Sequence, residues 1–202
     1  MDLMKYIFFL VLISLCSHHP GDVEHEDLNK STTRSIKPKS DIGKVLDKFN
    51  GVPVYYNGKI GNVFGRNLTH DGYNLGLKYQ CVEYVKRYYY YRMDHKMTDA
   101  YGHAKDFFDA SLEDSEFNED RGLYQFSNGS KFAPEKSDIL VFGPTPHNPF
   151  GHIGIVTEST NSTVEIIQQN VGRQTRAQYR LLKVQNRFYV EDKYVLGWLR
   201  KA

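Results

Sequence analysis

The sequence predicts an α+β fold in which N-terminal helices pack on a mostly antiparallel β-sheet. Three observations support this class. Apolar residues recur at helical spacing in the first half of the chain, whereas the second half reads as short apolar strands separated by turn residues. The chain has 202 residues, which is enough for one ordinary domain, and it contains no internal repeat. We expect the folded domain to span residues 41–202.

The first 16 residues are typical of a signal peptide. Lys5 precedes a mostly apolar run over residues 6–15, which is too short to span a membrane. Residues 13–16 are also similar to a bacterial lipoprotein cleavage box, in which Cys16 would be lipidated and would anchor the protein to a membrane. Ordinary cleavage and release is the alternative. Both routes predict an exported protein that is secreted, periplasmic or lipid-anchored outside the cytoplasmic membrane.

Residues 17–40 are predicted to form a polar linker, because they contain almost no large apolar side chains. Three histidines in this segment have no cysteine or carboxylate frame, so they predict no metal site. The formal net charge of the whole chain is +2, with 26 basic and 24 acidic residues. This balance gives no reason to expect a nucleic-acid partner, and we expect a monomer.

The elements of the expected domain follow from spacing and turn residues. Residues 41–49 predict a helix with Asp41 as N-cap, and residues 61–76 predict a long irregular loop. Residues 111–121 are acidic and expected to be exposed. Two further helices are expected over residues 81–93 and 99–110. The expected strands cover residues 52–56, 138–142, 152–157, 164–169, 179–184, 188–190 and 195–199.

The helix expected at residue 81 begins with a cysteine. The helix dipole and the free N–H groups of the first turn favour a thiolate at this position. Removal of a signal peptide would leave Cys81 as the only cysteine of the mature chain, which excludes an intramolecular disulfide. The alternative is a small buried hydrophobe. We interpret Cys81 as a nucleophile.

A cysteine nucleophile needs a base and a group that orients the base. His152 is the best candidate for the base, because it begins a strand directly after Gly151 and a proline-rich loop. A structural histidine at a strand end is the alternative. Gln168 and Asn170 would share one face of the following strand if that strand continues, and an amide oxygen on this face can orient an imidazole.

The same chemistry needs donors for the oxyanion of the intermediate. The backbone N–H of Cys81 is one expected donor. The second is expected from Gln80 or from a group in the loop of residues 72–79. The sequence does not choose between these two sources.

Five blocks of the sequence, in order and spaced as in the family, resemble the CHAP domain, the cysteine, histidine-dependent amidohydrolase/peptidase. The blocks are Gln80-Cys81-Val82-Glu83-Tyr84, Pro134 with Ser137-Asp138-Ile139-Leu140-Val141-Phe142, Gly151-His152-Ile153-Gly154-Ile155-Val156-Thr157, Gln168-Gln169-Asn170-Val171, and Leu196-Gly197-Trp198. The resemblance covers roughly residues 52–200 and is strongest to the amidase domain of bifunctional glutathionylspermidine synthetase/amidase.

The resemblance implies a papain-like fold, with Cys81 as nucleophile and His152 as general base and acid. Asn170 matches an asparagine of the family pattern. Gln168 stands where the family commonly carries a glutamate. A carboxylate stabilises an imidazolium by its charge, whereas the amide of Gln168 only orients the ring.

These observations predict a thiol amidohydrolase that uses neither a metal nor an organic cofactor. The expected export makes peptidoglycan the leading substrate class, and a small amide conjugate such as glutathione–polyamine is the alternative. A CHAP-like binding module with weakened catalysis is a third hypothesis, which Gln168 supports. Four Asn-x-Ser/Thr triplets, at Asn29, Asn67, Asn128 and Asn161, leave bacterial and eukaryotic secretion both open.

Overall fold

The computed structural model describes residues 41–202. The predicted signal peptide of residues 1–16, the lipidation site at Cys16 and the linker of residues 17–40 lie outside the described residues, so these remain predictions. Within the described part of the chain, no helix is both long enough and apolar enough to cross a membrane.

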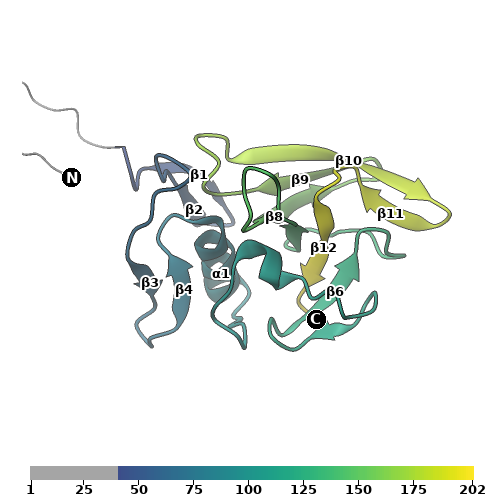
Figure 1. The fold of residues 1–202 in the computed structure, drawn as a ribbon, viewed down its shortest axis with the longest axis horizontal. Coiled ribbons are helices and arrows are strands. Elements are labelled where there is room, and N and C mark those ends of the chain that lie inside the picture. The colour runs from purple at the N-terminus through teal and green to yellow at the C-terminus, as the bar shows by residue number, and fades with distance from the viewer. Residues whose placement is uncertain (1–40) are drawn as a thin grey trace, which may run out of the picture. The chain divides into compact units, whose positions relative to one another are not determined.

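An antiparallel sheet of eight strands forms the largest part of the fold (Figure 1). The strand order is β11-β10-β9-β8-β7-β12-β6-β5, and each hydrogen-bonded pair is antiparallel. The predicted antiparallel sheet is therefore confirmed. Its strands are β5 (Phe117–Asn118), β6 (Leu123–Ser127), β7 (Ile139–Phe142), β8 (His152–Ser159), β9 (Thr163–Ile167), β10 (Arg176–Val184), β11 (Arg187–Val190) and β12 (Val195–Arg200).

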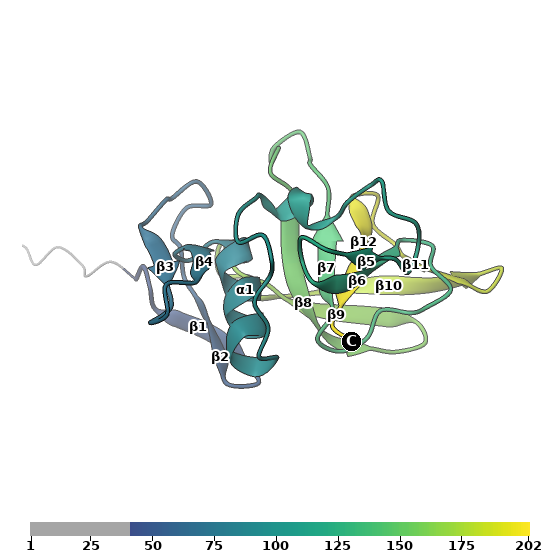
Figure 2. The same ribbon diagram turned by 90° about the horizontal axis from the view of Figure 1, so that it is seen from below.

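Two small antiparallel hairpins precede this sheet in the chain, and both lie beside the helix in Figure 2. They pair β1 (Val45–Phe49) with β2 (Val52–Tyr55), and β3 (Arg66–Leu68) with β4 (Asn74–Leu77). The helix predicted over residues 41–49 is therefore wrong. Asn50 and Gly51 both have positive φ, 46° and 85°, and they close the tight turn of a hairpin between apolar strands. The predicted loop of residues 61–76 contains the β3–β4 hairpin.

The one α-helix among residues 41–202 is α1 (Cys81–Arg92), as predicted. It packs against β2, β4 and β8. Its aromatic side chains Tyr84, Tyr88 and Tyr89 are fully buried, together with Val85. Because α1 fills the space between the hairpins and the large sheet, it determines where Cys81 lies.

The third predicted helix, over residues 99–110, is wrong. Only the 3-10 turn η1 (Ala104–Phe107) forms there. Gly102 has a φ of +108°, and the Asp106 carboxylate accepts a hydrogen bond from the His103 backbone N–H at 2.7 Å, so the turn begins late. The segment 111–121, expected to be exposed, contains the buried Arg121, whose guanidinium donates to backbone carbonyls.

Both faces of the central strand β7 are buried. Ile139 and Val141 belong to the hydrophobic cluster that surrounds α1, whereas Leu140 and Phe142 belong to a second cluster around Trp198. A strand that is covered on both faces reads as an unbroken apolar run, as residues 139–142 do. Strand β8, the neighbour of β7, also contributes side chains to both clusters, so the core packs against both of its faces.

Gly197 lies in β12 at a point where no side chain fits. A Cβ atom there would lie 2.0 Å from the Phe126 carbonyl oxygen and 2.7 Å from a ring carbon of Phe108. Gly197→Ala is expected to lower the free energy of unfolding by about 1–3 kcal/mol, measured by urea unfolding with Trp198 fluorescence. Gly61→Ala is the matched control, because a Cβ at Gly61 meets nothing within 4 Å. Equal midpoints for the two variants would contradict this prediction.

Candidate active site

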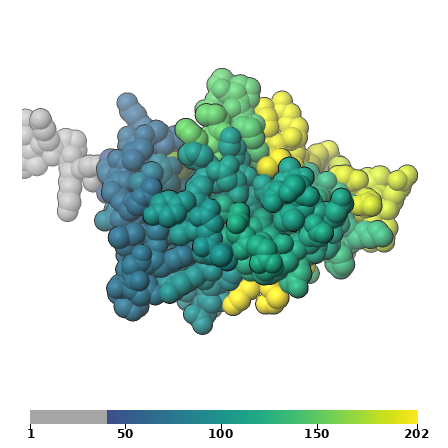
Figure 3. Space-filling model, turned by 60° about the horizontal axis from the view of Figure 1, so that its bottom comes forward, coloured from purple at the N-terminus to yellow at the C-terminus, as the bar shows by residue number. Residues whose placement is uncertain are grey.

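A cavity of about 740 Å³ opens at the N-terminus of α1. Its walls come from residues 60–66, from residues 100–104 and from the loop of residues 147–151 that leads into β8. In the space-filling view this green loop stands beside the teal segment that follows α1 (Figure 3). Four of the predicted site residues line the cavity: Gln80, Cys81, His152 and Asn170.

Cys81 and His152 begin the two elements that meet at this cavity. Cys81 is the first residue of α1 and is half-buried, and His152 is the first residue of β8. The backbone N–H groups of Ile153, of Val82 and of Cys81 itself are near enough to the Cys81 sulfur to act on its pKa, in the direction of a lower value. The start of β8 therefore lies directly against the thiol.

The surroundings of this pair favour its neutral form at rest. Burial raises the pKa of the Cys81 thiol, and the three backbone N–H groups at the sulfur offset only part of this effect. Burial also lowers the pKa of His152, although its hydrogen bond to Gln168 acts in the opposite direction. Both shifts act against the thiolate form that the sequence predicts, and desolvation is the largest cause of each.

Gln168 holds the imidazole of His152. Its Oε1 lies 2.9 Å from His152 Nε2, and the Gln168 side chain is buried. An amide oxygen only accepts hydrogen bonds, so Nε2 is the donor of this bond and Nδ1 is the acceptor nitrogen of the neutral ring. Nδ1 is thus the atom that would take a proton from the thiol.

Asn170 does not take the role expected of it. Strand β9 ends at Ile167 and Asn170 has a φ of +70°, so the alternation that would put Gln168 and Asn170 on one face does not continue. Asn170 Nδ2 donates to Gln80 Oε1 at 2.6 Å, and its Oδ1 accepts from Asn57 at 2.7 Å. Asn170 therefore positions Gln80 rather than the imidazole.

The side chain of Gln80 is held at both ends. Besides the bond from Asn170, its Nε2 donates to the Asn62 carbonyl oxygen at 2.7 Å. One hydrogen of this amide is therefore engaged with the wall of the cavity, and the second is the one that a substrate oxygen would meet. The oxyanion role of Gln80 and of the Cys81 backbone N–H stays a prediction.

Gln169 is a positioning residue that the sequence analysis did not single out. Its Nε2 donates to the Gln80 carbonyl oxygen and to the Glu83 carboxylate, both at 2.9 Å, and its Oε1 accepts from the Tyr55 N–H at 2.7 Å. The side chain is buried. Gln169 thus ties the segment that holds His152 to the start of α1. A polar residue between two candidate site residues is the only signal of this role in the sequence.

The structure separates the roles of the two amides in a testable way. Gln168→Ala is expected to lower kcat/KM about tenfold, the kinetic equivalent of one hydrogen bond. It should also move the acidic limb of the pH profile to lower pH, because the bond to Gln168 raises the pKa of His152. Asn170→Gly, which accepts the positive φ, should leave that limb unchanged. A shift of the limb in Asn170→Gly would contradict this assignment.

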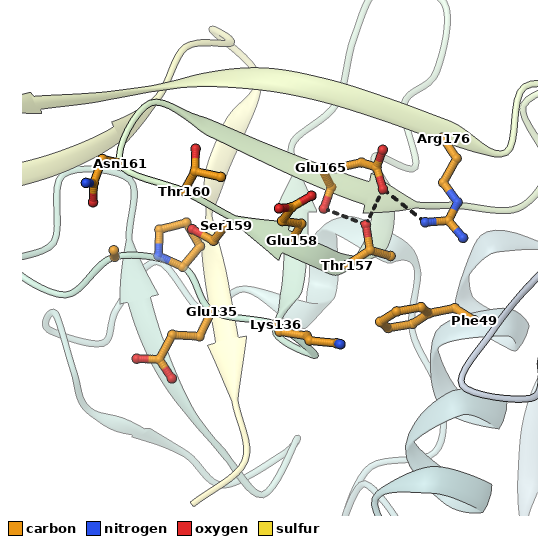
Figure 4. Close-up of a pocket in the computed structure, with 12 residues that line it drawn as sticks. Phe49, Glu135, Lys136, Thr157, Glu158, Ser159, Thr160, Asn161, Glu165 and Arg176 are labelled. Atoms are coloured by element: carbon orange, nitrogen blue, oxygen red, sulfur yellow. Dashed lines mark hydrogen bonds and ion pairs between the residues drawn. The ribbon is translucent and has the colours of Figure 1, made fainter.

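A second cavity, of about 680 Å³, shares no lining residue with the first. Figure 4 shows Thr157, Glu165 and Arg176 joined there by hydrogen bonds and an ion pair, with Phe49 nearby. Neither cysteine nor histidine lines this cavity, so it offers no candidate nucleophile–base pair of this type. Within residues 41–202, no group of three or more His, Cys, Asp or Glu side chains is placed to hold a metal ion.

Several known proteins are similar to this chain in sequence. The chain is 36% identical over 101 residues to glutathionylspermidine synthase of Crithidia fasciculata, covering 48% of this chain and 14% of that protein. It is 28% identical over 148 residues to bifunctional glutathionylspermidine synthetase/amidase of Escherichia coli (strain K12), covering 66% and 23%. The chain spans less than a quarter of the length of each of these relatives.

Solved structures give a more limited match. The crystal structure of Ly7917 aligns with a TM-score of 0.25 and 22% identity, covering 35% of this chain and 29% of that chain. The crystal structure of Ly7917 with the hydrolyzing product of MDP aligns with a TM-score of 0.24 and 24% identity, over the same shares of the two chains.

The family model of the CHAP domain matches residues 71–170. This range begins just before β4 and ends at Asn170, so it contains α1, the whole loop before β8, and the Gln168–Asn170 segment. Cys81, His152 and Gln168, which the structure brings together, all lie within it. In sequence, residues 71–170 of this chain are therefore similar to the CHAP domain family.

Proposed function

We propose that this protein is a thiol-dependent amidohydrolase or peptidase. The observation that carries the proposal is the placement of Cys81 and His152 in one cavity, with Gln168 Oε1 2.9 Å from His152 Nε2. A nucleophile, a base and an orienting group in this arrangement are what acyl transfer through a thioester needs. The amidase named among the similar proteins supports the same reaction class.

The reaction begins from the neutral pair. His152 Nδ1 takes the thiol proton as the Cys81 sulfur attacks the amide carbonyl carbon, and the carbonyl oxygen becomes an oxyanion. The backbone N–H of Cys81 and the free amide hydrogen of Gln80 stabilise that oxyanion. His152 then gives its proton to the departing amine, which leaves an acyl-thioester. Water activated by His152 hydrolyses the thioester, releasing a carboxylic acid and restoring the thiol.

Peptidoglycan is the substrate class that we propose first. The signal peptide predicted for residues 1–16 would take the protein to the compartment that contains the cell wall. Export, and lipidation at Cys16, belong to this proposal. A glutathione–polyamine amide is the second candidate, because two of the similar proteins are named for glutathionylspermidine chemistry.

The test is mass spectrometry of products from peptidoglycan and from glutathionylspermidine, each incubated with the wild-type protein and with Cys81→Ala. The wild type is expected to release a new amine and a new carboxylic acid from one substrate. Its Cys81 peptide is expected to carry a transient acyl mass increment. Identical products from the wild type and Cys81→Ala on both substrates would refute the enzymatic proposal. Unchanged binding of peptidoglycan by both proteins would then favour the binding module that Gln168 suggested.

A further inference from the structure

The cavity at Cys81 carries positive charge without any carboxylate. Arg66, at the start of β3, lines it, and no Asp or Glu of the described residues does. The histidines His103 and His147 also line it and are exposed. Within residues 41–202, Arg66 forms no ion pair with a carboxylate. Its charge is therefore available to a molecule in the cavity.

The guanidinium of Arg66 is held in one place. Its central carbon lies 5.2 Å from the centre of the Tyr101 ring, and its Nη1 lies 3.5 Å from Asn74 Oδ1. Tyr101 lines the cavity and is 62% exposed. A guanidinium that stacks on an aromatic ring keeps its N–H groups directed outward in its plane, where they match the two oxygens of a carboxylate.

Two buried cations lie behind the same wall. Lys86 Nζ donates to the carbonyl oxygens of Asn74 and Ala100, the latter at 2.7 Å. Arg121 Nη1 donates to the Tyr101 carbonyl oxygen at 3.1 Å. Neither cation forms an ion pair with a carboxylate among the described residues.

The charges in this wall influence one another. Burial lowers the pKa of Lys86 to about 8, and the positive charges of Arg121 and Arg66 add to that effect, against the charge of Asp99. An anion bound beside Arg66 would offset this repulsion. A cationic group bound there would increase it.

We infer that the cleft recognises a free carboxylate of its substrate through Arg66, stacked on Tyr101. The inference rests on the proposed function and makes it more specific. The substrate class is an acidic peptide amide with a carboxylate close to the scissile bond. A polyamine moiety is excluded from this wall, because it would place ammonium groups against Arg66 with no carboxylate to pair with them.

The test measures the binding of soluble peptidoglycan fragments to Cys81→Ala protein, so that no turnover is needed. One sample of fragments keeps its free carboxylates, and the other has them converted to methylamides. We expect the carboxylate form to bind about tenfold to a hundredfold more tightly. Arg66→Gln should remove this preference, and Arg66→Lys should restore only part of it. Lys78→Gln, an exposed cation outside the cavity, should keep the full preference.

Equal affinity for the two forms in the parent protein, including no measurable binding of either, would overturn the inference. So would an undiminished preference in Arg66→Gln. Failure of the proposed function looks different: the wild type would bind the carboxylate form with the expected preference but release no product. Because Arg66 is exposed, its substitution is not expected to affect folding, and a circular dichroism spectrum checks this.

Discussion

Cys81→Ala and His152→Ala are each expected to remove nearly all amide hydrolysis. Loss of the base alone should lower kcat/KM by about 10²–10⁴-fold, and loss of the nucleophile by at least as much. In the proposed mechanism the thiol and the imidazole act as a unit, so the double variant should be no slower than the slower single variant. Steady-state kinetics on the substrate identified by mass spectrometry measures all three.

The matched control for this prediction is His70→Ala, which removes an exposed histidine that does not line the cavity. It should retain the wild-type kcat/KM. Losses that multiply in the double variant would show that Cys81 and His152 act independently, which would contradict a shared mechanism. Retained activity in either single variant would contradict the assignment of that residue.

The pH profile of the wild type follows from the same pair. His152 must be neutral to accept the thiol proton, so kcat/KM should rise with pH as the imidazole loses its proton. Burial lowers the pKa of His152, so the midpoint of this rise should lie below the ordinary value of 6.5. Burial raises the pKa of the Cys81 thiol, so no thiolate absorbance is expected at neutral pH. Thiolate absorbance at neutral pH, together with a fall in kcat/KM as the imidazolium loses its proton, would instead indicate a resting ion pair.

Glu83→Ala is expected to destabilise the fold by about 3–5 kcal/mol, because it leaves a buried cation without its partner. Arg87 Nε lies 2.6 Å from Glu83 Oε1, and both side chains are buried. Asn67 and Gln169 also donate to the Glu83 carboxylate, at 2.7 and 2.9 Å. The substitution thus removes the acceptor of three side chains directly beneath Cys81.

Equilibrium unfolding in urea, followed by the fluorescence of the single tryptophan, measures this loss. Glu191→Ala is the matched control, because the ion pair of Glu191 with Arg180 is exposed and should contribute about 0–1 kcal/mol. Glu83→Gln, which keeps the shape and part of the hydrogen bonding, should fall between the two. A loss below about 1 kcal/mol for Glu83→Ala would show that Arg87 finds another partner.

Local patterns predicted the second half of the fold and the helix of Cys81. The apolar runs at residues 139–142 and 152–157 have no helical spacing, and they form the centre of the sheet. The first half was misjudged where two signals competed. Residues 42–49 carry apolar side chains at helical spacing, but Asn50-Gly51 closes a hairpin, and pairing of β1 with β2 determines the outcome. Apolar residues at helical spacing over only eight positions are weaker evidence for a helix than Asn50-Gly51 is for a hairpin, because this dipeptide favours the tight turn between two paired strands.

The candidate site was predicted from the sequence as far as residue type and order allow. Local signals predict Cys81 at the start of a helix and His152 at the start of a strand. The structure places both residues in one cavity. Asn170 could not be assigned, because its role depends on where β9 ends and on its positive φ. Gln169 could not be found at all, because its partners come from distant segments of the chain.

The sequence by itself determined the antiparallel sheet, the helix that begins at Cys81, and the choice of Cys81 and His152 as candidate site residues. These features can be predicted because residue spacing, turn residues and short motifs are all properties of residues close together in the sequence. Only the tertiary structure decided the burial of these two side chains, the partner of the imidazole and the charge of the cavity. Each of these depends on burial and on contacts between segments far apart in the chain, such as Arg66 beside Tyr101, and long-range contacts leave no local pattern.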